Sequence, residues 1–181
     1  MGKRSTGKFE RVAKDFYRTP YEAVVPLLPH IQNIKYFIEP CAGDGILIEH
    51  LKPLDCVYAL DIDPPNKLTI STKDALTLQP YHISAFGNNK KPTHFITNPP
   101  WSREILHPLI EHLSWLLPTW LLFDADWAYT KQSIPYMKCC RKIVAVGRVR
   151  WFPATKMTGK DNAAWYLFDK KYAGVTGFYG R

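Results

Sequence analysis

The sequence offers no recognisable site for a structural metal ion. Four cysteines are present, but no two of them form a C-x-x-C pair, and the six histidines show no metal-ligand spacing. The adjacent residues Cys139 and Cys140 cannot easily form a disulfide bond with each other. The composition therefore predicts no bound metal, reduced thiols and a cytoplasmic protein.

Long apolar segments are also absent. A helix that spans a bilayer needs about 20 consecutive apolar residues, and no run of that kind occurs. The first residues, MGKRSTGK, are basic and lack the apolar stretch of a signal peptide. The sequence thus predicts a protein without membrane contact.

Acidic residues are scarce relative to basic ones. The 181 residues include 16 Asp and Glu but 24 Lys and Arg, so the formal net charge is +8. Basic surfaces attract phosphates and release counterions, and an aromatic content of 14% provides faces on which bases can stack. Together these features favour a nucleic-acid partner, although a basic protein with an aromatic core would share them.

Hydrophobic residues make up 46% of the chain and charged residues 22%, a balance typical of a folded domain rather than a disordered chain. The length suits one such domain. We predict a basic N-terminal arm at 1–14, a single domain at 15–173 and a C-terminal tail at 174–181. The arm is either a solvated tail or a phosphate contact.

Short apolar runs alternate with helical periodicity along the chain. Strands alternating with helices predict a mostly parallel sheet covered by helices on both faces. The polar loop PATKMTGKDN joins the last two runs, which predicts a C-terminal antiparallel hairpin. The expected fold class is therefore α/β, with seven strands at 36–40, 57–63, 68–72, 93–101, 119–125, 142–152 and 163–169.

Helix boundaries follow from capping residues and prolines. Thr19 and Pro20 are expected to start a helix whose length Pro29 limits. Ser102 is expected to cap an amphipathic helix over 102–116. The links between the second, third and fourth strands are short for helices, so the fold is expected to be trimmed on that side.

Two glycines mark the turn after the first strand. Gly43 and Gly45 would let the backbone approach a ligand closely, at the start of the following helix. Asp61 lies 16 residues beyond Gly45 at the end of the next strand, where doubly wound folds place a carboxylate that accepts ribose hydroxyls. Asp63 is a less favoured substitute. A tight turn without a ligand would explain the glycines alone.

The acids around this turn favour a cationic ligand. Glu39 precedes the glycines, and a carboxylate there would attract a sulfonium and an amino group but repel the pyrophosphate of a dinucleotide. The spacing Glu39-x-x-x-Gly43-x-Gly45 resembles motif I of class I S-adenosylmethionine methyltransferases. The resemblance implies S-adenosyl-L-methionine as cofactor and the Rossmann-like class I methyltransferase fold. Asp74 would then accept from the adenine amino group, or it caps a helix. The implied cofactor residues here are Glu39, Cys41, Ala42, Gly43, Gly45, Asp61, Ile62, Asp74 and Ala75.

The turn Asn98-Pro99-Pro100-Trp101 is the most specific feature of the sequence. Its two prolines end the fourth strand and fix the turn. The Asn98 side-chain oxygen and the Pro99 carbonyl could then accept both hydrogens of one amino group, which favours a nitrogen lone pair aimed at a methyl donor. Trp101 could stack on a planar target. A proline-stiffened loop is the simpler alternative.

The turn resembles motif IV, (D/N/S)PP(Y/F/W), of amino methyltransferases, and the likeness covers roughly residues 16–169. Asn98 would also contact the cofactor. The segment 15–20 resembles motif X of adenine-N6 DNA methyltransferases, which implies that Phe16, Tyr17, Thr19 and Pro20 help to enclose the cofactor.

Downstream, 148–152 resembles the motif VIII strand, whose aromatic residue packs against a flipped base. Trp151 or Phe152 would face the base, since successive strand residues alternate. Ordinary core packing would also explain both rings. Arg150, together with Lys156 and Lys160 in the hairpin loop, is expected to contact substrate, because no separate recognition domain is evident.

The resemblance therefore implies methylation of adenine N6 in DNA, in a small format like that of phage enzymes. An RNA amino methyltransferase, a protein glutamine methyltransferase and an inactive nucleic-acid-binding module remain as alternatives. Asp124 and Asp126 either shape the substrate side of the cleft or cap a helix.

Overall fold

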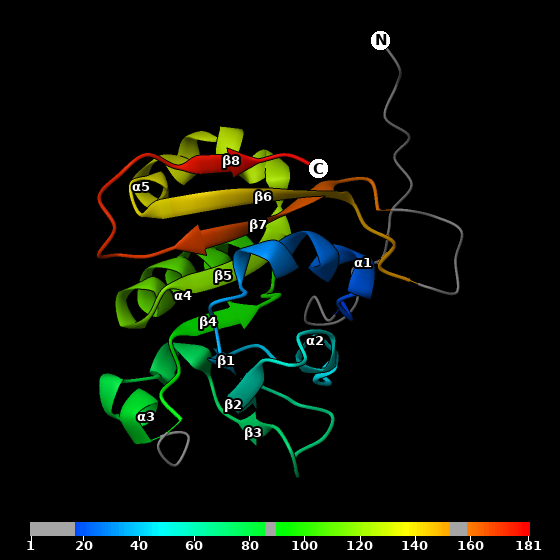
Figure 1. Cartoon of the computed structure of the whole chain (residues 1–181), viewed down its shortest axis with the longest axis vertical. Coiled ribbons are helices and arrows are strands. Elements are labelled where there is room, and N and C mark those ends of the chain that lie inside the picture. The colour runs from blue at the N-terminus through cyan, green and yellow to red at the C-terminus, as the bar shows by residue number, and fades with distance from the viewer. Residues whose placement is uncertain (1–16, 86–89, 153–158) are drawn as a thin grey trace.

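A computed structural model describes residues 17–85, 90–152 and 159–181 (Figure 1). Within these ranges, eight strands form one sheet in the order β3-β2-β1-β4-β5-β7-β6-β8. The first five run parallel, whereas β7 is antiparallel to both β5 and β6. The strands are β1 Tyr36–Glu39, β2 Asp55–Asp61, β3 Ser71–Thr72, β4 His94–Thr97, β5 Thr119–Asp124, β6 Cys140–Arg148, β7 Asn162–Phe168 and β8 Gly177–Tyr179.

The predicted fold class is confirmed, including the antiparallel hairpin of β6 and β7. The described sheet has eight strands instead of seven, because β8 pairs in parallel with β6 inside the segment predicted as a tail. Three residues of strand in a glycine-containing segment are too short to stand out as an apolar run. Residues 1–14 lie outside the described part of the chain.

Fewer of the connections between successive strands contain a helix than in a regular alternation of strands and helices. No helix lies between β2 and β3 in this described stretch, and only short ones lie between β3 and β4, as the short links predict. The α-helices are α1 Tyr21–Val24, α2 Ile46–His50, α3 Pro80–Ala85, α4 Arg103–Leu116 and α5 Ile134–Met137, and the 3-10 helices are η2 Val25–His30, η3 Ala75–Thr77, η4 Ala125–Tyr129 and η5 Lys131–Ser133.

The N-cap position of Ser102 is confirmed, whereas that of Thr19 is wrong. The first helix has Pro20 as its N-cap, so Thr19 lies outside it and its hydroxyl is used elsewhere. Ser102 occupies the N-cap position of α4 with extended backbone, but its hydroxyl makes no capping hydrogen bond to this described helix. The fourth strand ends at Thr97, before the prolines, because neither proline has an N–H to donate to a sheet.

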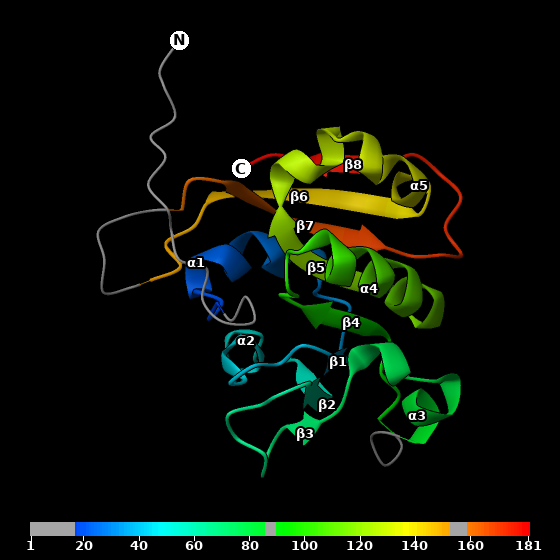
Figure 2. The same cartoon turned by 180° about the vertical axis from the view of Figure 1, so that it is seen from behind.

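The core lies on both faces of the sheet. One cluster packs α1, η2 and α2 against the strands, and two others pack α4, η3 and η4 against the opposite face. Figure 1 shows α1 in front of the sheet, and Figure 2, from behind, shows α4 and α5 in front. A buried hydrogen bond of 2.7 Å from Trp165 Nε1 to the Ala23 carbonyl joins β7 to α1. None of the helices described is long and apolar enough to cross a membrane.

Candidate active site

A cavity of about 550 Å³ opens where β1, β2 and β4 end. Parallel strands present their carboxyl ends at one edge of the sheet, so the loops after them meet there. The cavity gathers most of the residues predicted to bind cofactor. Of the predicted site residues, its walls include Tyr17, Thr19, Glu39, Cys41, Ala42, Gly43, Asp61, Ile62, Asp74, Ala75, Asn98 and Pro100.

The glycine turn is held in place by Asp61. One carboxylate oxygen of Asp61 accepts from the Gly43 N–H at 2.8 Å, and the other accepts from the Asp63 N–H at 2.9 Å. Gly45 has a φ of +82°, a left-handed conformation that residues with a Cβ rarely adopt. The sequence therefore needs glycine at this position to start α2, and Asp61 links the two loops that form this wall.

Glu39 is the buried acid of the site. Its side chain is 2% exposed, and its Oε2 atom has no hydrogen-bond partner in the described residues. Burial raises the pKa of Glu39 well above 4.5, and the negative charges of Asp44 and Asp61 raise it further. A buried acceptor without a partner is costly unless a ligand supplies a donor or a positive charge.

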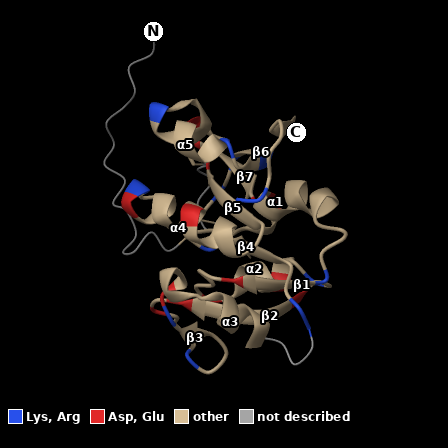
Figure 3. Cartoon of the chain, turned by 90° about the vertical axis from the view of Figure 1, so that its left-hand side faces the viewer, with Lys and Arg blue, Asp and Glu red and all other residues tan. Residues whose placement is uncertain are grey.

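Carboxylates dominate the charge of the cavity wall. Besides Glu39, Asp61 and Asp74, the wall includes Asp44, Asp63 and Glu104, whereas Arg18 is the only basic residue among the described residues that line it. Figure 3 shows acidic residues beside α2, β1 and β3. Arg18 is itself paired with Asp44, with 2.5 Å between Nε and Oδ2. A chain of net charge +8 thus has a negative cavity, which favours a cationic ligand over a phosphate.

Asp74 caps η3, since its carboxylate accepts from the Leu76 N–H at 2.8 Å. It also lies on the cavity wall, so the cap leaves one carboxylate oxygen for a ligand. The structure confirms the cap, and the contact of Asp74 with an adenine amino group stays a prediction.

Asn98 connects the cavity to the proline turn. Its Nδ2 donates to the Tyr17 carbonyl and to the Thr19 hydroxyl, each at 3.2 Å. Its Oδ1 accepts from Trp101 Nε1 at 3.3 Å. An amide oxygen has two lone pairs, so one acceptor position of Asn98 remains for a further donor.

Trp101 and Trp151 form the aromatic side of the site. Trp101 Nε1 also donates to the Leu122 carbonyl at 3.1 Å, which fixes the indole against β5. The Trp151 ring meets Trp101 edge to face at 5.5 Å between centroids and lies 6.0 Å from Tyr17. Phe152 is more exposed, with its ring 5.8 Å from Tyr17. Trp151 therefore lies beside the proline turn, whereas Phe152 contacts Tyr17. Strand β6 ends at Arg148, so neither ring belongs to this strand, which the sequence predicts over 142–152, and which ring faces a base stays a prediction.

For the other predicted site residues, the structure gives a position but less evidence of a role. Pro99 is buried in the turn, Pro20 caps α1, and Lys160 is exposed after the hairpin loop. Arg150 is exposed, and its backbone N–H donates to Glu22 at 2.9 Å. Phe16 and Lys156 lie outside the described residues.

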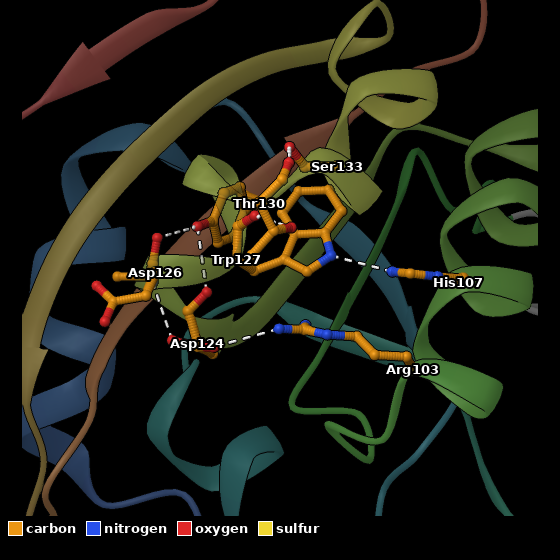
Figure 4. A network of polar contacts seen from close by, with 9 residues as sticks. Arg103, His107, Asp124, Asp126, Trp127, Thr130 and Ser133 are labelled. Carbon is orange, nitrogen blue, oxygen red and sulfur yellow. Dashed lines mark hydrogen bonds and ion pairs between the residues drawn. The ribbon is translucent and has the colours of Figure 1, made fainter.

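Asp124 stabilises the end of β5. It caps η4 by accepting from the Asp126 N–H at 2.9 Å, and it pairs with Arg103 at 3.3 Å (Figure 4). Close by, Trp127 Nε1 donates to His107 Nε2 at 3.0 Å. These contacts support the capping interpretation of Asp124.

Sequence reasoning missed several residues of the cavity. Arg18 lies within the segment that resembles motif X. Its positive charge could have indicated a contact with the acidic residues of the glycine turn. Ile105 and Leu109 reach the cavity from α4, where helical periodicity alone could not separate core from cavity lining. No group of metal-binding side chains occurs in the part of the chain described.

No family model matches the sequence, and no curated protein matches it. Solved structures do resemble it. A dimethyladenosine transferase from Plasmodium falciparum is 18% identical, with a TM-score of 0.56 over 86% of this chain and 64% of that protein. The 23S rRNA methyltransferase ErmE is 17% identical, with a TM-score of 0.56 over 87% of this chain and 71% of that one.

The chain has the class I methyltransferase fold. It spans less than two thirds of the length of the Plasmodium protein. In this fold the carboxyl edge of the parallel strands is the place for ligands, and the acid-lined cavity lies at that edge.

Proposed function

We propose that the chain is an S-adenosylmethionine-dependent methyltransferase that methylates the N6 amino group of adenine in DNA. The observation that carries the proposal is the position of Asn98. Its amide lies on the wall of the acid-lined cavity and at the start of the proline turn, so it stands between a cofactor site and a target site.

The charge, the hydrogen-bond acceptors and the apolar surface of the cavity suit S-adenosylmethionine. The unpartnered oxygen of Glu39 suits the positive charge of the methionine part. Asp61 has acceptor capacity left for ribose hydroxyls, beyond the two backbone N–H groups that it holds. Ile62, Leu76 and Ile105 line the cavity although each is exposed, so an adenine ring would cover apolar surface there.

The target amino group would be held by two acceptors. Asn98 Oδ1 has a lone pair left beside its bond from Trp101, and the Pro99 carbonyl lies on the next residue. When bound, S-adenosylmethionine supplies the methyl group to the nitrogen held there. Holding both amino hydrogens favours a pyramidal nitrogen and orients it, and the surplus proton leaves to solvent.

The aromatic residues beside the turn suit a base. Trp101 donates to Asn98 and contacts the Trp151 ring, and a flipped base needs flat apolar surfaces of this kind to replace its stacked neighbours. Trp101 is fixed by two hydrogen bonds, which would keep its face in one orientation.

RNA is the second candidate substrate, because the two solved structures named above are a dimethyladenosine transferase and a 23S rRNA methyltransferase. The same acceptors and aromatic faces serve an adenine in either polymer. The resemblance of residues 15–20 and 98–101 to adenine-N6 DNA methyltransferases places DNA first.

The test is transfer of tritiated methyl from S-adenosylmethionine to unmethylated DNA, total RNA and protein in parallel. Label in DNA that is recovered as N6-methyladenine supports the proposal. Asn98→Ala should abolish it, whereas Asn33→Ala, the same change at an exposed residue of a loop, should not. Label confined to RNA or to glutamine in protein would overturn DNA as the substrate.

A further inference from the structure

Cationic and aromatic side chains lie close together at the free edge of the sheet, where β8 pairs with β6. Strand β8 pairs with β6 so that Tyr179 lies opposite Val144, and the Lys142 ammonium lies 5.5 Å from the centroid of the Tyr179 ring. Phe178 and Tyr179 are 66% and 41% exposed. Exposed aromatic rings interleaved with cations are the pattern of surfaces that bind nucleic-acid strands.

Arg181 continues this edge toward the hairpin. Its guanidinium lies against Gly147, where an added Cβ would meet Arg181 Nη1 at 2.8 Å. Gly147 has a φ of +85° beside an irregularity in the pairing of β6 with β7, which is the geometry of a bulge that needs glycine. The bulge thus makes room for the Arg181 side chain beside Gly147. Figure 1 shows the C-terminal end pointing past β6 toward the hairpin.

The cations of this edge are not neutralised within the fold. In the stretches of chain that the structure describes, no carboxylate forms an ion pair with Lys142, Arg148 or Arg181, whereas Arg18, Arg103 and Arg141 are each paired with an aspartate. We refer to Lys142, Arg148, Phe178, Tyr179 and Arg181 as the β8 edge. Unpaired surface guanidinium groups are available for phosphate oxygens.

The β8 edge leads to the candidate target site. Arg148 ends β6, and three residues later the Trp151 ring touches Trp101 of the proline turn. From Lys142 to Arg148 the strand covers about 20 Å at about 3.3 Å per residue, enough for several phosphates of one strand. The C-terminal end of β6 therefore lies three residues before a ring that contacts the candidate target site.

We propose that the β8 edge binds the sugar-phosphate backbone of the nucleic-acid substrate beside the target nucleotide, with Phe178 stacking on a base. This inference rests on the proposed function for its target site. A competing explanation is that Lys142 and Arg181 only protect an exposed strand edge from pairing with other chains.

The test measures binding of a fluorescein-labelled 20-nucleotide DNA, as single strand and as duplex, and of the RNA of the same sequence, by anisotropy from 50 to 200 mM NaCl. The variant is the double substitution Arg148→Gln and Arg181→Gln. Losing two phosphate contacts should reduce the slope of log K against log salt by about 1.5. Phe178→Ala should weaken binding about five-fold or more with the slope unchanged.

The matched control is Lys35→Gln with Lys91→Gln. It removes the same charge from two exposed residues that precede β1 and β4, on the other side of β5 and β7 from β6. Its slope should stay within about 0.3 of the wild type, because distant charges add little once screened. Light scattering of each variant checks for association through the strand edge.

Methyl transfer by the same variants separates this inference from the proposed function. If the wild type methylates nucleic acid and the Arg148/Arg181 variant keeps the wild-type slope, the β8 edge does not bind substrate and the function stands. Association of that variant without a slope change supports edge protection instead. If the wild type binds oligonucleotides through the β8 edge but methylates only protein, the edge is a nucleic-acid-binding surface, but its role beside a target nucleotide fails together with the proposed function. If no oligonucleotide binds, the inference fails.

Discussion

The Nδ2 atom of Asn98 donates to the hydroxyl of Thr19 at 3.2 Å. The Thr19 hydroxyl is buried, and the Tyr17 carbonyl accepts the second hydrogen of the same nitrogen. Two acceptors on one side of the amide force its oxygen to face the other way, toward Trp101. We therefore predict that Thr19 is a positioning residue, which keeps the Asn98 oxygen in the orientation that a target amino group would require.

Thr19→Val tests this orientation. Valine keeps the shape of threonine but removes the acceptor, so the amide can rotate and present its nitrogen to the target. We expect kcat to fall about 10- to 100-fold, with a smaller change in the KM for S-adenosylmethionine. Thr19→Ser restores the hydroxyl and should recover most of kcat. A rise in that KM with kcat unchanged would contradict the positioning role and support a cofactor contact.

Glu39 should make cofactor binding depend on pH. Burial raises the pKa of Glu39 above 4.5, and only the ionised form attracts a cation. As pH rises through that raised pKa, affinity for S-adenosylmethionine should increase, with release of up to one proton on binding. Titration calorimetry in buffers of different ionisation enthalpy measures the proton. Glu39→Gln should lose the pH dependence, and an unchanged proton release in that variant would exclude Glu39 as its source.

The raised pKa of Glu39 should also make the free energy of unfolding depend on pH. Because the folded pKa of Glu39 lies above the unfolded one, the folded state holds its proton longer as pH rises from 4.5. The free energy of unfolding of the ligand-free protein should therefore decrease as pH rises through the interval between the two pKa values. Glu39→Gln should remove this decrease in urea unfolding measured at several pH values, and its persistence would point to another group.

Asp61 should determine cofactor affinity through the glycine turn. Asp61→Ala removes the acceptor of the Gly43 and Asp63 N–H groups and a partner for ribose hydroxyls. The Kd for S-adenosylmethionine should rise roughly 10- to 100-fold, since hydrogen bonds to charged groups contribute about 1.5–3 kcal/mol. Asp63→Ala provides the comparison, and a larger loss there would move the ribose contact to Asp63.

Much of the site is predictable from the sequence because its residues follow strands. The apolar runs locate β1, β2 and β4 closely enough to assign Glu39, Asp61 and Asn98 to one edge of the sheet. Parallel strands bring such residues together whatever the lengths of the connecting loops. The predicted and observed positions of these residues agree because of the sheet topology, and the agreement does not depend on predicting the exact end of each strand.

The remaining features depend on side-chain contacts that no spacing reveals. The sequence predicts Thr19 as a helix cap, yet its hydroxyl accepts from Asn98, 79 residues away. Strand β8 escapes prediction because three residues give too short a pattern, and its pairing with β6 is a long-range choice. The role of Arg18 is equally hidden, because its pairing with Asp44 becomes visible only when two loops are placed together.

Asp124 is predicted to contribute to stability through its cap of η4 and its ion pair with Arg103. Asp124→Ala removes the cap of η4 and the partner of Arg103, whose Nη1 is already buried without a hydrogen bond to any described residue (Figure 4). We expect the free energy of unfolding to fall by about 2–3 kcal/mol, measured by urea unfolding. Asp126→Ala, at an exposed neighbour, should cost under about 0.5 kcal/mol.

Removing Arg103 as well should recover part of the loss from Asp124→Ala. In the double variant Arg103→Met with Asp124→Ala, the partly buried cation no longer lacks a partner, so the two losses should not add. Purely additive losses would show that the ion pair is energetically unimportant. A variant Asp124→Ala that keeps its stability but loses methyl transfer would instead place this carboxylate on the substrate, because a cap contributes to folding and not to the reaction.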